Sequence, residues 1–157
     1  MIAALCCLLA GSAASLYQSA LQAYSRNDLS STQALLEKAK AADPRHFPTR
    51  FLLGAALVRL ERVAEAIVEL ESAHALRPAE VDVVKLLAIQ YNSLGRFADS
   101  LRVLAATPEK PRDEELYLLL IESHHESGSP DEAGRLTRRA SSRFPSSAAV
   151  NAWMASS

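Results

Sequence analysis

Cysteine, glycine and proline are scarce in this chain. Only two of its 157 residues are cysteine, five are glycine and seven are proline. The two cysteines, Cys6 and Cys7, are adjacent, and neighbouring cysteines rarely bridge each other because the intervening loop is strained. A disulfide framework and a thiolate metal site are therefore excluded. The low glycine and proline content excludes a linker-rich or disordered chain.

An excess of charge of one sign is also absent. The formal net charge is -1 at pH 7, whereas a general nucleic-acid binder carries a large positive excess, so we expect no nucleic acid among the partners. Aromatic residues make up only 6% of the chain, and the abundance of alanine and leucine favours helices over sheets. The composition thus indicates one helical domain of ordinary size, without indicating its chemistry.

Residues 1–14 form an almost continuous apolar run. The run is too short to span a membrane comfortably, but it has the length of the hydrophobic region of a signal peptide. Ser12 and Ala14 have the spacing that a signal peptidase needs, so cleavage after Ala14 is expected, although no Lys or Arg precedes the run. The protein would then be secreted or periplasmic. The alternatives are a packing helix, the tail of an earlier repeat, or an uncleaved anchor, which would leave the protein cytoplasmic or membrane-tethered. Membrane association is expected only through this run.

The rest of the sequence repeats itself with a period of about 34 residues, the signature of stacked helical units. The shift carries Leu36 to Leu70 and then to Leu104, and it carries the closing Pro44 to Pro78. Small residues follow the same shift at the positions Ala20, Gly54 and Ala88. With one residue of slippage the pattern continues to Pro145. A repeat domain over 15–146 is therefore predicted, with repeats at about 13–46, 47–80, 81–113 and 114–146.

Each repeat is predicted to be a pair of helices, because apolar residues recur at helical spacing on both sides of a short turn. The four turns are Asn27-Asp28, Glu61-Arg62, Gly95-Arg96 and Gly128-Ser129. Gly and Asn suit the left-handed residue that ends a helix, and Ser129 with Glu132 predicts a capping box. The third repeat is irregular, because Thr107-Pro108-Glu109-Lys110-Pro111 shortens its second helix.

The period, the pair Leu53-Gly54, Tyr91, Gly95 and Phe97 resemble the tetratricopeptide repeat (TPR) family over about 13–146. The bulky aromatic residue that the family has near the start of each first helix is present only as Tyr117. The resemblance implies an all-α fold, a right-handed superhelix (α-solenoid) of about four helical hairpins plus a C-terminal helix. Residues 147–157 are predicted to form that helix, either as a cap or as the start of an incomplete fifth repeat.

The resemblance also implies a concave groove lined by the first helices, which would hold a protein or peptide partner. Carried over to this chain, its lining residues are Tyr17, Leu21, Tyr24, Phe51, Ala55, Val58, Lys85, Ile89, Asn92, Leu118, Glu122 and His125. The part from the first two repeats is aromatic and apolar, and the remainder is mixed and polar. Tyr17 and Tyr24 have an alternative role, in which they pack under the N-terminal segment.

No catalytic or cofactor motif occurs in the sequence. His124 and His125 are the nearest approach to a metal site, but adjacent histidines on a helix point about 100° apart and cannot easily share a metal. One packed and one exposed histidine are expected instead. The sequence contains no nucleophile elbow, phosphate-binding loop or dinucleotide fingerprint. No enzyme activity, cofactor or metal is therefore predicted.

The hypothesis that follows is a non-enzymatic protein–protein interaction scaffold. Two alternatives stay open at this point: a membrane-anchored assembly factor that uses an uncleaved N-terminal helix, and a fragment of a larger multidomain protein or longer repeat array. The identity of the partner, the pathway and the oligomeric state do not follow from the sequence.

Overall fold

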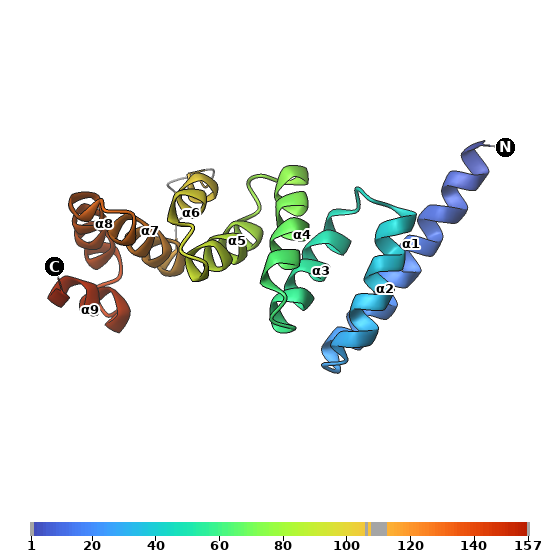
Figure 1. The fold of residues 1–157 in the computed structure, drawn as a ribbon, viewed down its shortest axis with the longest axis horizontal. Helices are drawn as coiled ribbons and strands as arrows, with labels where there is room; N and C mark the ends of the chain where they lie inside the picture. The colour runs from blue at the N-terminus through green and yellow to red at the C-terminus, as the bar shows by residue number, and fades with distance from the viewer. Residues whose placement is uncertain (1, 106, 108–112, 157) are drawn as a thin grey trace. The chain divides into compact units, whose positions relative to one another are not determined.

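The computed structural model describes residues 2–105, 107 and 113–156, with the side chains of residues 13–105, 107 and 113–155. These ranges contain helices and no strand (Figure 1). The helices are α1 Ile2–Ser25, α2 Leu29–Ala42, α3 Phe47–Arg59, α4 Val63–Leu76, α5 Val81–Ser93, α6 Phe97–Leu104, α7 Glu114–Glu126, α8 Pro130–Arg143 and α9 Ala148–Ser156. They form two compact units, unit 1 (Met1–Pro78) and unit 2 (Ala79–Ser157).

Consecutive helices pack as hairpins within each unit. In unit 1, α1 pairs with α2 and α3 pairs with α4, while α2 packs on α3. In unit 2, α5 pairs with α6 and α7 pairs with α8, while α9 packs on α8. The predicted all-α fold of about four helical hairpins plus a C-terminal helix is therefore confirmed.

The same turn ends the first helix of all four hairpins. Asn27, Glu61, Gly95 and Gly128 have positive φ angles of 61°, 59°, 69° and 82°. In each turn the next residue donates its backbone N–H to a carbonyl five residues back, as Arg96 does to Tyr91 at 2.8 Å. This is the Schellman arrangement, in which a left-handed residue lets the chain satisfy the last free carbonyls of the helix. The four predicted turns are thus confirmed, and Glu61 is the residue least suited to its conformation.

A cluster of aliphatic residues forms the core of unit 1. Its buried members come from all four helices: Ala20, Leu36, Leu52, Leu53, Leu57 and Ala66. Gly54 lies where α3 and α4 approach most closely, because a Cβ atom added there would be 2.6 Å from the Cγ atom of Leu70. The small residue that the repeat pattern placed at this position is therefore required by the close packing of the two helices.

Unit 2 has the shortened second helix that the sequence predicts. Helix α6 has 8 residues, whereas α8 has 14. Of the segment that was expected to shorten it, 108–111 lies outside the described residues. Helix α7 is anchored by the fully buried Tyr117, whose ring meets that of Phe144 edge-on at a centroid distance of 6.0 Å.

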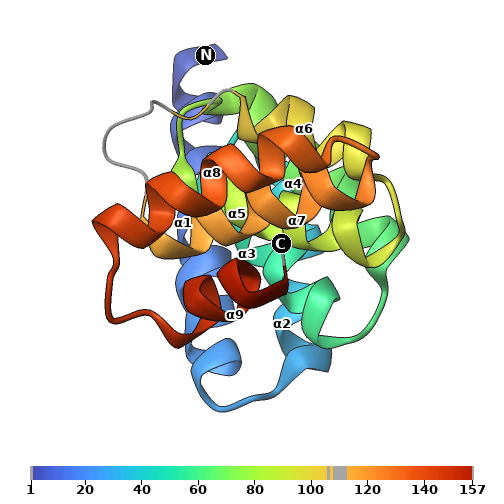
Figure 2. The ribbon, with the colours of Figure 1, turned by 90° about the vertical axis from the view of Figure 1, so that its left-hand side faces the viewer.

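The C-terminal helix α9 follows a turn after α8, and the chain reverses direction there (Figure 2). Ser147 starts it, because its hydroxyl oxygen accepts from the N–H of Val150 at 3.1 Å and its O–H donates to Glu114 at 2.7 Å. Val150 is fully buried, whereas Met154 is 45% exposed. Whether α9 acts as a cap or begins a fifth repeat stays a prediction.

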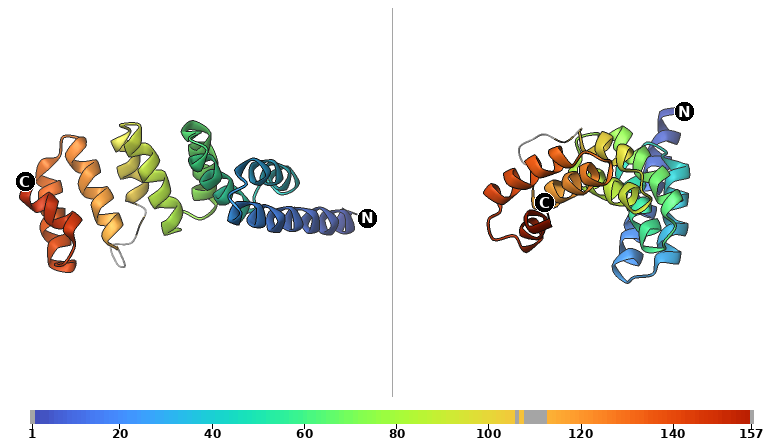
Figure 3. Two further views of the ribbon diagram at one scale, coloured as in Figure 1. Left: turned by 90° about the horizontal axis from the view of Figure 1, so that it is seen from below. Right: turned by 60° about the vertical axis from the view of Figure 1, so that its left-hand side comes forward.

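Helix α1 runs without a break from Ile2 to Ser25, and its N-terminal turns extend beyond α2 (Figures 1 and 3). The expected cleavage point after Ala14 therefore falls inside a helix, and the signal peptide stays a prediction. Among the described residues, no helix has both the length and the hydrophobicity that crossing a membrane requires.

One local prediction about helix starts is wrong. Ser129 is the N-cap residue of α8 and Pro130 begins the helix, as expected, but the Ser129 side chain makes no capping hydrogen bond. Glu132 instead pairs with Arg135. Besides Ser147, side-chain caps are formed by Asp28, which accepts from the N–H of Ser31, and by Asp113, described below.

Candidate functional site

Helices α1 and α3 of unit 1 run side by side in the same direction. The ring of Tyr17 meets His46, at the start of α3, edge-on at a centroid distance of 5.3 Å. Seven residues further along α1, Tyr24 lies under the guanidinium of Arg59, at the end of α3, with 4.8 Å between the guanidinium carbon and the ring centroid. Residues at equivalent turns of the two helices are therefore neighbours.

This arrangement brings the six sites predicted in unit 1 onto one surface. We call it the first-helix face of unit 1, and its residues are Tyr17, Leu21, Tyr24, Phe51, Ala55 and Val58. All six side chains are half-buried. Tyr17, Leu21, Tyr24 and Val58 pack against the core cluster on their inner side. The face is therefore fixed to the core of the unit and still presents apolar surface to solvent.

The aromatic side chains of this face are supported by further ring contacts. Phe51 stacks on Phe47 with 6.0 Å between centroids and 13° between the planes, and the guanidinium of Arg77 lies 4.3 Å from the Phe47 centroid. Burial raises the pKa of the Tyr17 hydroxyl, so this group stays protonated at neutral pH and can donate a hydrogen bond.

The predicted sites in unit 2 are engaged in polar contacts with their neighbours. The ammonium of Lys85 forms ion pairs with Asp113 and, at 2.9 Å, with Glu115. Burial alone would lower the pKa of Lys85, but the hydrogen bonds and charges of the two carboxylates outweigh burial and raise it. Asp113 also accepts from the N–H of Leu116 at 3.0 Å and so caps α7. Lys85 thus ties α5 to the start of α7.

A second polar link joins the other ends of α5 and α7. The Nδ2 atom of Asn92 donates to Glu122 at 2.8 Å, and its Oδ1 atom accepts from the hydroxyl of Ser123 at 3.0 Å. The Ser123 hydroxyl is 3.0 Å from that of Ser100 on α6, and both serines are fully buried. Two predicted sites, Asn92 and Glu122, are therefore bonded to each other.

The remaining predicted sites of unit 2 have different surroundings. Ile89 is 37% exposed and Leu118 is half-buried. His125 is exposed and meets the indole of Trp153 on α9 edge-on, with 5.3 Å between centroids. Because the two units are placed separately, one surface that joins all twelve predicted residues stays a prediction.

An ion network in unit 1 was not predicted from the sequence. Glu69 on α4 is 7% exposed and accepts from Lys40 of α2 at 2.9 Å and from Arg50 of α3 at 2.6 Å. Burial alone would lower the pKa of Lys40, but bonds from Glu37 and Glu69 raise it. A signal was present in the sequence, because the equivalent positions of α6 and α8 hold the apolar Val103 and Leu136.

The histidine pair divides as expected. His124 is half-buried with a buried Nδ1 atom, and His125 is exposed. Across the part of the chain that the structure describes, no group of three or more His, Cys, Asp or Glu side chains is placed to hold a metal ion.

Comparison with known proteins identifies the repeat. Residues 57–123 match the family model of the tetratricopeptide repeat. A tetratricopeptide repeat protein from Parabacteroides merdae superimposes with a TM-score of 0.84 at 17% sequence identity, covering 92% of this chain and 58% of that chain. The chain therefore contains tetratricopeptide repeats, matched in sequence over residues 57–123.

Two further solved structures share the fold of this TPR protein. PilF of Pseudomonas aeruginosa has a TM-score of 0.75 at 15% identity, over 92% of this chain and 67% of its own. YrrB, described as a TPR protein with an unusual peptide-binding site, has a TM-score of 0.76 at 21% identity, over 83% of this chain and 68% of its own. No curated protein matches the TPR protein in sequence. At these identities the likeness shows the fold alone.

Proposed function

We propose that this TPR protein is a non-enzymatic scaffold that binds a peptide segment of a partner protein on the first-helix face of unit 1. One observation carries the proposal: two parallel helices present rows of half-exposed apolar side chains at matching turns. The family fold supports protein–protein interaction in general, and the peptide-binding site in the description of YrrB is consistent with it.

The chemistry of the face specifies the kind of segment that would bind. Tyr24 and Phe51 offer large rigid surfaces that lose little conformational entropy on binding. Leu21 and Ala55 of the same face carry no hydrogen-bond donor in their side chains, so these two positions favour apolar contacts over the binding of a terminal carboxylate. The expected ligand is therefore an internal segment whose apolar side chains cover the rings, as in other interfaces centred on aromatic residues.

The proposal is tested by affinity capture with the immobilised full chain, followed by titration of synthetic peptides from the captured protein. Phe51→Glu places a charge on the face without touching the core cluster, and we expect it to weaken peptide binding by about tenfold or more. Tyr24→Ala should act in the same direction. The matched control is Val68→Ala, which removes an apolar side chain that is 58% exposed on α4 and should change nothing.

The outcome is judged on folded protein, so helical content by circular dichroism accompanies each titration. Equal peptide affinities for the wild type, Phe51→Glu and Val68→Ala would show that the partner binds elsewhere.

The export signal is a separate proposal. We propose that residues 1–14 are removed on export, which would leave Tyr17, Leu21 and Tyr24 in place on a shortened α1. N-terminal sequencing of the protein from its native source tests this idea. A mature chain that begins at Ser15 supports export, and one that retains residues 1–14 favours the anchor or packing alternatives.

A further inference from the structure

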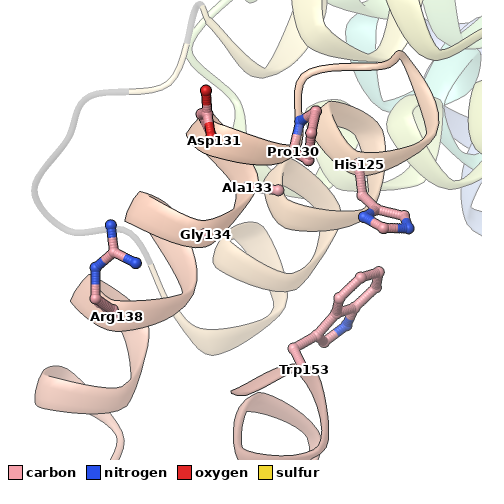
Figure 4. A pocket seen from close by; sticks show the side chains of 7 residues that line it. All are labelled: His125, Pro130, Asp131, Ala133, Gly134, Arg138 and Trp153. Atoms are coloured by element: carbon pink, nitrogen blue, oxygen red, sulfur yellow. The ribbon is translucent and has the colours of Figure 1, made fainter. Parts of the chain in front are cut away.

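A cavity of about 420 Å³ lies between the end of α7, the first half of α8 and α9, within unit 2. Figure 4 shows its walls: the rings of His125 on α7 and Trp153 on α9 lie close to each other, and Gly134 and Arg138 lie on successive turns of α8. Its volume is within the range of small-molecule sites, about 300–1,000 Å³. The cavity is distinct from the first-helix face of unit 1, because every lining residue belongs to unit 2.

The cavity is open at Gly134, a repeat position that holds a larger side chain in the earlier repeats. In the repeat register, with its one-residue slippage before the fourth repeat, Gly134 corresponds to Leu101 in α6 and Ile67 in α4, which are half-buried and buried respectively. A Cβ atom added at Gly134 would have only one contact within 4 Å, the Nη1 atom of Arg138 at 3.7 Å. The space that a branched aliphatic residue fills in the earlier repeats is therefore open here.

The groups around this space combine an aromatic wall with a cation. Trp153 is half-buried, meets His125 edge-on and lines the cavity. The guanidinium of Arg138 lies over Gly134 and has no ion-pair partner among the residues that the structure describes, whereas Arg135, on the same helix, pairs with Glu132.

The cavity also contains a carboxylate, that of Asp131. Asp131 is seven residues from Arg138, which corresponds to about 10 Å along the helix axis. In Figure 4 its side chain points away from Trp153. Because the guanidinium of Arg138 reaches back over Gly134, the cation and the carboxylate lie about one helical turn apart along the same side of α8.

We infer that this cavity binds an aromatic carboxylate. The ring packs against Trp153 and His125 in the space left by Gly134, and the carboxylate accepts hydrogen bonds from the guanidinium of Arg138. A guanidinium presents paired donors that match a carboxylate, and aromatic rings prefer edge-on or offset contacts of the kind already present here. The same chemistry is offered by a free aromatic acid and by the C-terminal aromatic residue of a peptide.

The test uses Trp153 as its own reporter, because it is the only tryptophan in the chain. The full-length protein is titrated with N-acetylphenylalanine, with the corresponding neutral amide, and with tetraglycyl-phenylalanine in free-acid and amidated forms. Both acids should change the tryptophan emission saturably, and each neutral form should bind about tenfold more weakly or worse, since it loses a charge-assisted contact. Tighter binding of the peptide acid would assign the site to peptide termini, and equal affinity would assign it to free acids.

Two pairs of variants locate the site. Gly134→Leu fills the cavity and should abolish the response, whereas Gly134→Ala adds one methyl group to open space and should retain it. Arg138→Gln should weaken the binding of both acids by about tenfold. Arg135→Gln is the matched control and should leave the affinity for both acids unchanged. The inference is overturned by an absence of saturable response at millimolar acid, by equal affinity for acid and amide, or by undiminished binding to Gly134→Leu.

Discussion

The first helices of the two units share one backbone register but carry different chemistry. Position by position, Phe51 and Val58 on α3 correspond to Lys85 and Asn92 on α5. In unit 1 these side chains pack against other apolar groups and stay half-exposed. In unit 2 they are bonded to the first helix of the next repeat, Lys85 to Asp113 at the start of α7 and Asn92 to Glu122 on α7.

This difference suggests separate roles for the two units, one in packing between repeats and one in partner binding. A partner that docked on α5 would have to compete with the carboxylates already bonded to Lys85, and breaking such pairs costs desolvation energy. A partner on α3 would cover Phe51 without breaking a polar contact, and the hydrophobic effect would favour the burial. The polar contacts of unit 2 therefore hold neighbouring repeats together, and this difference supports the proposal that a partner binds on the apolar face of unit 1. The predictions below test this difference, with hydrogen exchange and mass spectrometry following each unit in the full-length chain.

The largest effect is expected from filling the closest helix contact. Gly54→Val introduces a Cβ atom 2.6 Å from the Cγ atom of Leu70, and overpacking of this kind costs about 1–3 kcal/mol. Ala88 occupies the equivalent position of unit 2, and Ala88→Gly should cost only the helix propensity of about 1 kcal/mol. Chemical denaturation measures the total change in the free energy of unfolding. Hydrogen exchange should assign the loss to unit 1 for Gly54→Val and to unit 2 for Ala88→Gly. Unchanged hydrogen exchange in unit 1 of Gly54→Val would contradict the close packing of α3 against Leu70.

A smaller loss of stability is expected from breaking the ion pairs of Glu69 in unit 1, and a still smaller one from breaking those of Lys85 in unit 2. Glu69→Gln keeps the shape of a nearly buried side chain but removes the charge shared by Lys40 and Arg50, and we expect a loss of about 1–2 kcal/mol, below the value for a fully buried pair because both cations are partly exposed. Lys85→Gln breaks pairs with Asp113 and Glu115, which are about half-exposed, and should cost less than about 1 kcal/mol.

Urea titrations of the two variants compare the networks directly. A Lys85→Gln loss as large as that of Glu69→Gln would mean that exposure does not decide the strength of these pairs.

The helical framework could be read from the sequence because it depends on local chemistry. The period of 34 fixed the helix pairs, and Asn27, Gly95 and Gly128 marked left-handed turns that only a few residue types favour. The short α6 and the need for a small residue at Gly54 followed from the same pattern. Signals of this kind are carried by single residues at fixed spacing, so no knowledge of the tertiary contacts was needed.

The site was only partly predictable, because its details depend on side chains from separate helices. The pattern assigned Lys85, Asn92 and His125 to a groove by position alone, whereas their contacts depend on which residues the next helix presents. His125 meets Trp153 only because α9 turns back along α8. The cavity beside Gly134 shows the same limit: a missing side chain is visible in the sequence as a departure from the repeat, but the guanidinium and rings that surround the space are not.

Substitutions at equivalent turn residues should stabilise unit 1 and destabilise unit 2. Glu61 has a φ angle of 59°, a conformation that costs a residue with a Cβ atom about 1–2 kcal/mol. Glu61→Gly relieves this cost but increases the freedom of the unfolded chain, so we expect a net stabilisation of about 0.5–1 kcal/mol. Gly95→Ala, at the equivalent turn with a φ angle of 69°, should destabilise unit 2. Thermal denaturation of both variants should move in opposite directions, and a shared direction would show that the two turns are not equivalent.

The smallest effect is a pH dependence confined to unit 1. Burial lowers the pKa of His74 below its ordinary value of 6.5, and its Nδ1 atom is buried without a hydrogen-bond partner. As the pH falls below 6.5, the unfolded chain binds a proton at this histidine while the folded chain does not, so stability decreases until the lower folded pKa is reached. Above 6.5 both states are neutral at His74 and its contribution is constant. The effect is small because the imidazole is only half-buried and solvent screens its charge.

His74→Leu removes this contribution without introducing a charge. Between pH 8 and 5.5 the wild type should lose more stability than the variant, and hydrogen exchange should place the extra loss in unit 1. The comparison of slopes cancels the titration of the other histidines, since the two proteins share them. Parallel slopes for the wild type and His74→Leu would show that His74 is as accessible to protons in the folded chain as in the unfolded one.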